Sequence, residues 1–194
     1  FISTPSSISA VELLEKLNVA RFKVGSGDTS NLLLLKRLGK TRKPILLSSG
    51  MSSFEELETS IVFLRKFGNP LTIMQCTSKY PTGPKDWGLN VIQELKNRFE
   101  LPVGFSDHSG TIYASLAAAV MGAEVFEFHV VFDKRQFGPD VSSSITIDQV
   151  KILTEGIKAI QTAMNNPLNK NNISQCEDLK KMFGKSLSVN KNKK

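Results

Sequence analysis

The chain lacks the features that mark disulfide-bonded and membrane-spanning proteins. Its 194 residues include two cysteines, Cys76 and Cys176, which lie far apart and form no CxxC pair. No apolar run is long enough to cross a bilayer, and no charged-then-apolar signal segment opens the chain. The first absence excludes a CxxC redox or metal motif, and the second excludes a membrane-spanning helix. A reduced, cytoplasmic protein is the simplest interpretation.

The chain also lacks a long biased tract, and most of its charge lies at one end. Apolar residues make up 40% and charged residues 22%, which is typical of a globular domain with a sizeable core. Of the net charge of +7, residues 165–194 contribute +5, from seven lysines against Glu177 and Asp178. Only Phe183 adds an aromatic ring there, so we favour a solvated tail or linker over a nucleic-acid-binding segment.

Strand-like and helix-like segments alternate up to about residue 165. We expect strands at 1–4, 21–25, 45–48, 71–77, 103–107 and 124–129, and helices near 9–18, 30–38, 53–67, 88–98, 111–121 and 147–164. Capping-box signatures pair Ser9 with Glu12, Ser52 with Glu55, and Thr146 with Gln149. This alternation predicts a parallel sheet with right-handed crossovers.

Two parallel α/β folds fit this pattern. An open doubly wound sheet can use six strands, whereas a closed barrel needs eight. Polar residues follow every expected strand. Both folds bind ligands at these strand ends. A site to which every strand contributes is more typical of the barrel. We therefore predict an incomplete (β/α)₈ TIM barrel over residues 1–165, with about two β-α units missing before Phe1. Residues 166–194 are expected to form a linker and a helix around 175–183.

The two histidines of the chain, His108 and His129, each stand where an expected strand gives way to a loop. Alternation places Ser106 with His108 on one strand face and Glu127 with His129 on the next. We favour a divalent-metal site over two hydrogen-bonded structural histidines. Glu127 could orient His129 or bind the metal directly, and Asp107, on the opposite face, is expected to be a turn or outer-shell residue.

Other strand ends carry candidate anion-binding groups. Lys23 is expected to point into the barrel, two residues before Gly25-Ser26-Gly27, where either a ligand anion or an internal Asp would neutralise it. Ser48, Ser49 and Gly50 precede a helix, which suits phosphate binding but is also explained by an N-cap alone. Cys76 is expected to be a buried strand residue. Tyr80 could contact a substrate or pack under the loop that follows.

Together these segments resemble one known family, the sialic acid synthases. The resemblance rests on Phe1-Ile-Ser-Thr-Pro5, Phe22-Lys-Val-Gly-Ser-Gly-Asp28, Leu47-Ser-Ser-Gly-Met51, Gln75-Cys-Thr-Ser-Lys-Tyr-Pro81, Gly104-Phe-Ser-Asp-His108, Glu127-Phe-His129 and Gly138-Pro-Asp140. That family includes N-acetylneuraminate synthases and the legionaminic and pseudaminic acid synthases.

The resemblance implies a barrel enzyme that condenses phosphoenolpyruvate with an N-acetylated amino sugar such as N-acetylmannosamine and releases phosphate. His108 and His129 would hold a divalent cation, often Mn²⁺, with Mg²⁺, Co²⁺ or Zn²⁺ as alternatives. Among the remaining matching positions, Lys23 and Glu127 would be catalytic. Phosphoenolpyruvate would be bound by Lys23 and by the hydroxyl groups of Thr4, Ser26, Ser48 and Ser106. The acceptor sugar would be faced by Asp28, Tyr80 and Asp140, and Ser78 would also bind substrate. The resemblance also implies a homodimer in which a small C-terminal antifreeze-like domain reaches the partner's site.

The sequence departs from the family pattern at three of these segments. Asp28 stands where Glu is usual, Ser78 where Asn is frequent, and Phe128 where Lys or Arg is common. Alternation places Phe128 on the helix-facing side of its strand, away from the site. A second hypothesis is therefore kept open, in which the chain is a catalytically inactive remnant of such a synthase.

Overall fold

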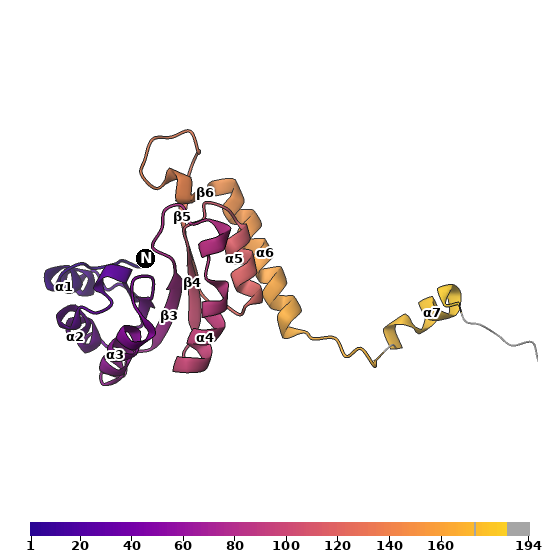
Figure 1. Ribbon diagram of the computed structural model, residues 1–194, viewed down its shortest axis with the longest axis horizontal. Coiled ribbons are helices and arrows are strands. Elements are labelled where there is room, and N and C mark those ends of the chain that lie inside the picture. Colours follow the sequence, from indigo (N-terminus) through magenta and orange to yellow (C-terminus); the bar gives the residue numbers. More distant parts are fainter. Residues whose placement is uncertain (173, 186–194) are drawn as a thin grey trace, which may run out of the picture.

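Short aliphatic segments form six parallel strands in a computed structural model that describes residues 1–172 and 174–185 (Figure 1). The strands are β1 (Phe22–Val24), β2 (Ile45–Ser48), β3 (Leu71–Cys76), β4 (Val103–Asp107), β5 (Phe126–Val131) and β6 (Ser144–Thr146). They lie in the sheet in the order of the sequence, β1 to β6. A doubly wound sheet would reverse its order at one point. The predicted incomplete (β/α)₈ barrel is thus confirmed.

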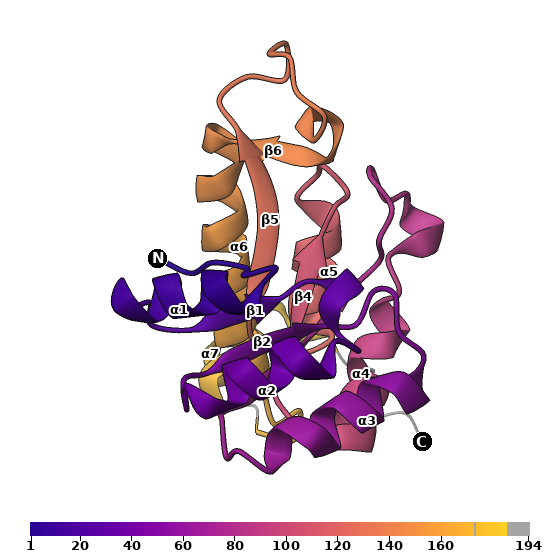
Figure 2. The same cartoon turned by 90° about the vertical axis from the view of Figure 1, so that its left-hand side faces the viewer.

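Six helices pack against the outer side of this curved sheet (Figures 1 and 2). They are α1 (Ile8–Lys16), α2 (Leu32–Lys40), α3 (Phe54–Arg65), α4 (Leu89–Phe99), α5 (Tyr113–Val120) and α6 (Ile147–Asn165). All six agree with the expected helices to within a few residues. A seventh, α7 (Glu177–Phe183), stands away from the sheet in Figure 1.

Alternation along the strands separates a helix-facing core from the barrel interior. Ile45, Leu47 and Ile73 are buried in the apolar cluster that the helices cover. Met74 is on the other face, where a Cβ at Gly104 would lie 2.5 Å from its Sδ atom. This close approach explains the glycine, because any side chain would displace the neighbouring strand. Side chains on that second face can therefore converge inside the barrel.

The prediction of a strand at residues 1–4 is wrong. This segment forms only one isolated bridge, between Ser3 and Phe22. Residues 2–4 nevertheless face Val125–Phe128 of the far side of the sheet across a pocket of about 290 Å³. We call this opening the seam. Figure 2 shows the amino-terminal segment beside β5. The sheet therefore curves far enough for its two sides to line a common space.

Two local expectations also need correction. Residues Ser144–Thr146 form β6, which pairs with the second half of β5 and was not expected from a stretch that reads as loop. The boxes at Ser9 and Ser52 are wrong: Ser7 caps α1, and Ser53 with Glu56 forms the box of α3. The box of Thr146 with Gln149 is confirmed. Adjacent serines made the two wrong signatures ambiguous by one or two positions.

The short helix expected around 175–183 is α7, which begins directly after a short turn at 174–176. Residues 186–194, which include part of the predicted approach to a C-terminal domain, lie outside the described residues. Among the described helices, none is both long and apolar enough to cross a membrane.

Candidate functional site

His108 follows β4 and is held by its own strand neighbours. Its Nδ1 atom lies 3.0 Å from the Thr77 carbonyl oxygen, and its main-chain oxygen accepts a bond from Thr82. Because a carbonyl only accepts, Nδ1 carries the proton and Nε2 keeps its lone pair. Burial lowers the pKa of His108, against the raising effects of the Thr77 bond and the Glu127 charge. The ring is therefore poised as a neutral ligand.

Three rings meet at the ends of β3 and β4 and on β5. His129 lies inside β5, two residues before its end, and not where the strand gives way to a loop as the sequence predicted. The centroids of His108 and His129 are 5.3 Å apart, and Tyr80 lies 4.2 Å from His108 and 5.7 Å from His129. The Tyr80 hydroxyl is 3.1 Å from His108 Nε2. Burial, and then the charges of Cys76, Glu127 and Asp140, raise the pKa of Tyr80, so its hydroxyl stays protonated and donates to that nitrogen. The structure thus brings together the two histidines that the sequence singled out.

Asp140 joins this group from the loop after β5. Its Oδ2 atom lies 3.9 Å from Nδ1 of His129. The carboxylate is more than half exposed, so it reaches the histidine from the solvent side. It can therefore face a ligand above the rings.

A second group lies deeper in the barrel, between β1, β4 and β5. Lys23 forms an ion pair with Glu127 Oε2, and Ser106 donates to the same oxygen at 2.6 Å. Burial alone would raise the pKa of Glu127, but the charge and hydrogen bond of Lys23 and the bond from Ser106 lower it. Ser106 Oγ also lies 3.4 Å from His108 Nε2, which links the ion pair to the three rings.

This group bears on two predictions from the sequence. The internal partner of Lys23 is Glu127, 104 positions away, and not an Asp. The carboxylate of Glu127 bonds to Lys23 and Ser106, and its pairing opposite Ser106 in the sheet holds it there. Asp107 lies on the helix-facing side of β4, as predicted, and is 3% exposed. Its carboxylate accepts hydrogen bonds from the main-chain nitrogen and the hydroxyl of Ser115 at the start of α5.

A third group lies around Gly50. A Cβ at this glycine would come within 2.8 Å of Ser26 Oγ, Ser78 Oγ and Cys76 Sγ. Ser26 and Cys76 are 3.2 Å apart, and Cys76 is buried, as predicted. The glycine therefore lets polar groups from two strand ends, Ser26 after β1 and Cys76 with Ser78 at the end of β3, approach one main-chain segment.

Two further predicted residues differ in their surroundings. Ser48 is buried, and its hydroxyl has no hydrogen-bond partner in the described structure. Thr4 lines the seam together with Lys23 and Glu127. An orphaned buried hydroxyl is costly, so a ligand oxygen at Ser48 would be stabilising.

Asp28, which was predicted to bind substrate, forms a local hydrogen bond, and in the described part of the chain its side chain has no hydrogen bond to the three groups above. Its carboxylate accepts a bond from Asn31 at 3.0 Å, within the turn that leads to α2. Phe128 packs, as predicted, against the apolar cluster of α5 and α6.

The residues present fit a divalent cation that takes few protein ligands. Within residues 1–172 and 174–185, no three His, Cys, Asp or Glu side chains form a ready-made metal cluster. Two imidazoles at 5.3 Å can share one ion, since metal–nitrogen bonds are about 2.0–2.1 Å long. Cations such as Mg²⁺ usually keep several waters and substrate oxygens as their other ligands.

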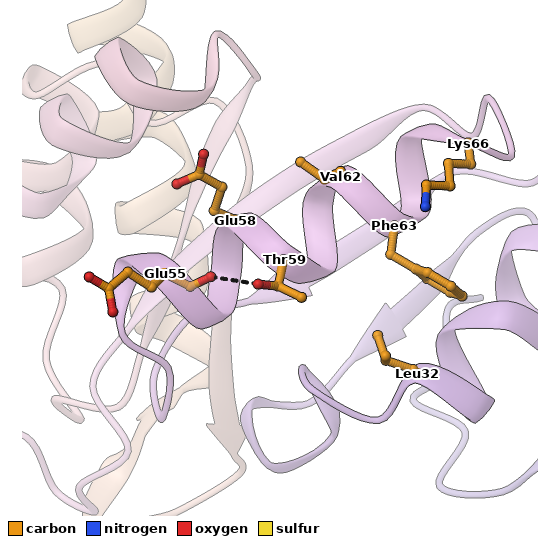
Figure 3. A pocket seen from close by; sticks show the side chains of 7 residues that line it. All are labelled: Leu32, Glu55, Glu58, Thr59, Val62, Phe63 and Lys66. Atoms are coloured by element: carbon orange, nitrogen blue, oxygen red, sulfur yellow. Dashed lines mark hydrogen bonds between the residues drawn. The ribbon is translucent and has the colours of Figure 1, made fainter.

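A larger hollow of about 500 Å³ lies outside the barrel, between α2 and α3 (Figure 3). Its lining includes Leu32, Val62 and Phe63 beside Glu55 and Glu58. None of the predicted site residues lines it. The candidate site residues therefore lie away from this hollow, on the barrel strands and the loops that follow them.

Sequence patterns missed two features of the site. The Thr77 carbonyl that fixes the His108 ring is a main-chain group and leaves no signature in the sequence. Lys134 donates from the loop after β5 to main-chain carbonyls on both sides of the site, and its charge alone did not single it out.

Comparisons with known proteins identify the family of this chain. A family model described as "NeuB family" matches residues 1–169. The N,N'-diacetyllegionaminic acid synthase of Campylobacter jejuni is 38% identical over 92% of this chain and 54% of its own length. The human N-acetylneuraminate-9-phosphate synthase is 37% identical over 81% of this chain and 44% of its own. The chain thus spans about half the length of these curated relatives.

A solved structure extends the likeness to three dimensions. The N-acetylneuraminic acid synthetase of Leptospira borgpetersenii, determined with citrate, superposes with a TM-score of 0.84 at 29% identity, covering 93% of this chain and 64% of that one.

Proposed function

This chain belongs to the NeuB family, and on that premise we propose that it is the barrel part of a nonulosonic acid synthase. The proposed reaction condenses phosphoenolpyruvate with an N-acetylated amino sugar such as N-acetylmannosamine. The names of the relatives support this reaction class, since they make legionaminic, pseudaminic or neuraminic acid products. They differ in the sugar, so the acceptor stays the least defined part of the proposal.

The observation that carries the proposal is the proximity of His108, just after β4, and His129, within the neighbouring parallel strand β5. The neutral state of His108, with Nδ1 bound to Thr77, leaves Nε2 available for a cation. A divalent cation there, for which we propose Mn²⁺, would supply Lewis-acid polarisation of the sugar aldehyde. A cation at Nε2 would also free the Tyr80 hydroxyl, which now lies 3.1 Å from that nitrogen, to face the acceptor.

The deeper groups suit the two anionic ends of phosphoenolpyruvate. Lys23 is the cation of the interior, and Ser48 offers a buried hydroxyl without a partner. Ser26, Ser78 and the main chain at Gly50 lie together next to the same interior. We propose that phosphoenolpyruvate takes Lys23 as its counter-ion and displaces part of the Lys23–Glu127 contact. Glu127, still bound to Ser106, then lies beside the reacting carbons.

The chemistry follows from holding both substrates in this way. As carbon 3 of phosphoenolpyruvate bonds to the aldehyde carbon, the carbon 2–carbon 3 and aldehyde double bonds become single bonds, and the aldehyde oxygen takes up a proton. Water adds at carbon 2 and gives up its protons. The bond from carbon 2 to the phosphate oxygen then breaks, so that a ketone forms and phosphate leaves. Lys23 and the hydroxyls orient the anionic substrate, Tyr80 and Asp140 orient the sugar, and Glu127 can hold the water or its proton. Positioning two substrates in this way can supply about 7–11 kcal/mol of the barrier reduction.

A second candidate, an inactive remnant, is favoured by the seam. Thr4, Lys23 and Glu127 border that opening, so the anion site is open on this side of the barrel. A remnant would keep the fold and bind phosphoenolpyruvate weakly without turnover.

Phosphate release from phosphoenolpyruvate separates the two candidates. We expect the purified chain to release phosphate when both N-acetylmannosamine and Mn²⁺ are present, or with another N-acetylated hexosamine from a small panel. His108→Asn and His129→Asn should each reduce the rate by at least about 100-fold, because the loss of an outer-shell partner alone costs about 10–100-fold at metal sites. Lys151→Ala, on the exposed side of α6, is the matched control and should keep the wild-type rate. Release that survives both histidine variants would disprove the proposal.

A further inference from the structure

The loop between β5 and β6 is fastened by one lysine. Lys134 Nζ donates to the carbonyl oxygens of Gly110 at 3.2 Å and Val141 at 3.3 Å, and also to that of Ser144. An ammonium has three donors, so all of them are used. Gly110 belongs to the loop that follows His108, whereas Val141 and Ser144 follow Asp140.

The two loops that Lys134 joins also touch through their main chains. Gly110 adopts a φ of +68°, and a Cβ there would lie 2.2 Å from the Ser142 carbonyl oxygen. Only glycine accommodates both the left-handed conformation and this approach. The contact lies two residues beyond His108, so the loop that carries Asp140 rests on the one that carries this histidine.

Asp140 is rigidly connected to the carbonyls that Lys134 binds. Its own carbonyl oxygen accepts bonds from the Ser143 main chain at 3.0 Å and from Ser144 Oγ at 2.7 Å. Residues 140–144 thus form one hydrogen-bonded unit. The neighbouring Arg135 differs, because its hydrogen bonds in the described structure go to Asp133 of the same loop.

We propose that Lys134 is a positioning residue, which fastens residues 140–144 onto the loop at Gly110 and so sets the place of Asp140 beside His129. The inference rests on the proposed function for its consequence, the shape of the metal and acceptor site. Its geometric part stands on contacts of the metal-free protein alone. Lys134 itself contacts neither substrate nor cation; it acts through Asp140, whose Oδ2 atom is 3.9 Å from His129 Nδ1.

The ring C–H signals of the histidines give a direct test in the metal-free protein. The chain has two histidines, so His108→Asn assigns both sets of NMR signals. We expect Lys134→Met to move or broaden the His129 signals at fixed pH. Arg135→Met removes the same charge one residue away and should leave them in place. Lys134→Arg, which keeps donors at that position, should restore the signals in part.

A double variant separates positioning from a general loss of stability. Asp140→Asn should itself move the His129 signals, and adding Lys134→Met should then change them little, because the group that Lys134 positions is already altered. Should Lys134→Met fail to fold, Lys134→Gln removes the ammonium but keeps an amide donor and allows the same comparison.

Binding of Mn²⁺ alone gives the consequence for the site. We expect Lys134→Met to weaken Mn²⁺ binding about tenfold, the lower end for loss of an outer-shell partner, with Arg135→Met unchanged. Unmoved His129 signals, or signals that move equally in both variants, would overturn the inference. If the wild-type chain binds no Mn²⁺, the proposed metal site fails, while the metal-free spectra still decide the role of Lys134.

Discussion

The polar residues His108 and Asp107 at the histidine end of the barrel are more deeply buried than Glu127 at the seam. At the histidine end, His108 and Asp107 have partners supplied by the main chain and by neighbouring helices. At the seam, Thr4, Lys23 and Glu127 border an open pocket, and the Glu127 side chain is 40% exposed. The histidine end is built from strands close in sequence, β3 to β5. The two walls of the seam are more than a hundred residues apart, so we expect it to be the weaker region.

The largest expected loss of stability is at Asp107, below the histidine end. Asp107→Ala would leave the buried main-chain nitrogen and hydroxyl of Ser115 without their acceptor. Hydrogen bonds to a buried charged group contribute about 1.5–3 kcal/mol, and orphaned donors add to that cost. We expect the free energy of unfolding in urea to fall by about 3 kcal/mol.

Ser115→Ala removes one donor of that pair and should cost about 1 kcal/mol. A loss at Asp107 no larger than this would mean that the histidine end is no better supported than the seam.

A smaller effect is expected at the ion pair that borders the seam. Lys23→Met and Glu127→Gln should each destabilise the chain modestly, with a coupling of about 1 kcal/mol in the double-variant cycle after screening by solvent. Additive losses in that cycle would show that the pair is not coupled.

The ion pair also predicts a pH dependence. The pKa of Glu127 is lowered on folding, so its ionised carboxylate stabilises the folded chain. This contribution to the free energy of unfolding is complete above the ordinary pKa of 4.5 and is lost as the pH falls from 4.5 through the lowered pKa of the folded state. Urea unfolding at neutral and at acid pH should therefore show wild type and Glu127→Gln approaching each other as the pH decreases. A gap that widens at acid pH would contradict this sign.

The smallest change in stability, with a clear change in association, is expected at the edge of the seam. Phe1 is 85% and Ile2 is 45% exposed, so apolar surface meets solvent at this edge. Ile2→Glu should alter the free energy of unfolding by less than about 0.5 kcal/mol, as exposed substitutions usually do. Sedimentation should show self-association of the wild-type chain that this variant reduces. A monomeric wild type with one cooperative unfolding transition would remove the contrast.

The elements that could be predicted from the sequence are those whose pattern is local. The spacing of apolar residues located all six barrel helices and β1 to β5, and strand alternation placed Ser106, His108, Glu127 and His129 together on one face. The three-residue β6 could not be predicted, because it gains its hydrogen bonds only from β5. The residue 1–4 segment has the composition of a strand but retains only one bridge.

The candidate site was predictable in its side chains and less so in its contacts. Both histidines, Lys23 and Tyr80 were recognisable from residue type and position. The choice of Glu127 as the partner of Lys23 depends on how far the sheet curves, which no local pattern encodes. Main-chain partners such as the Thr77 carbonyl arise from the same tertiary arrangement.

Binding of Mn²⁺ to the purified chain, followed by the loss of the free-ion electron paramagnetic resonance signal, tests most directly whether the two imidazoles share one cation. We expect one ion per wild-type chain, and no comparable site in either His108→Asn or His129→Asn. Wild-type affinity retained in either single variant, or no binding by the wild-type chain, would contradict a shared metal site.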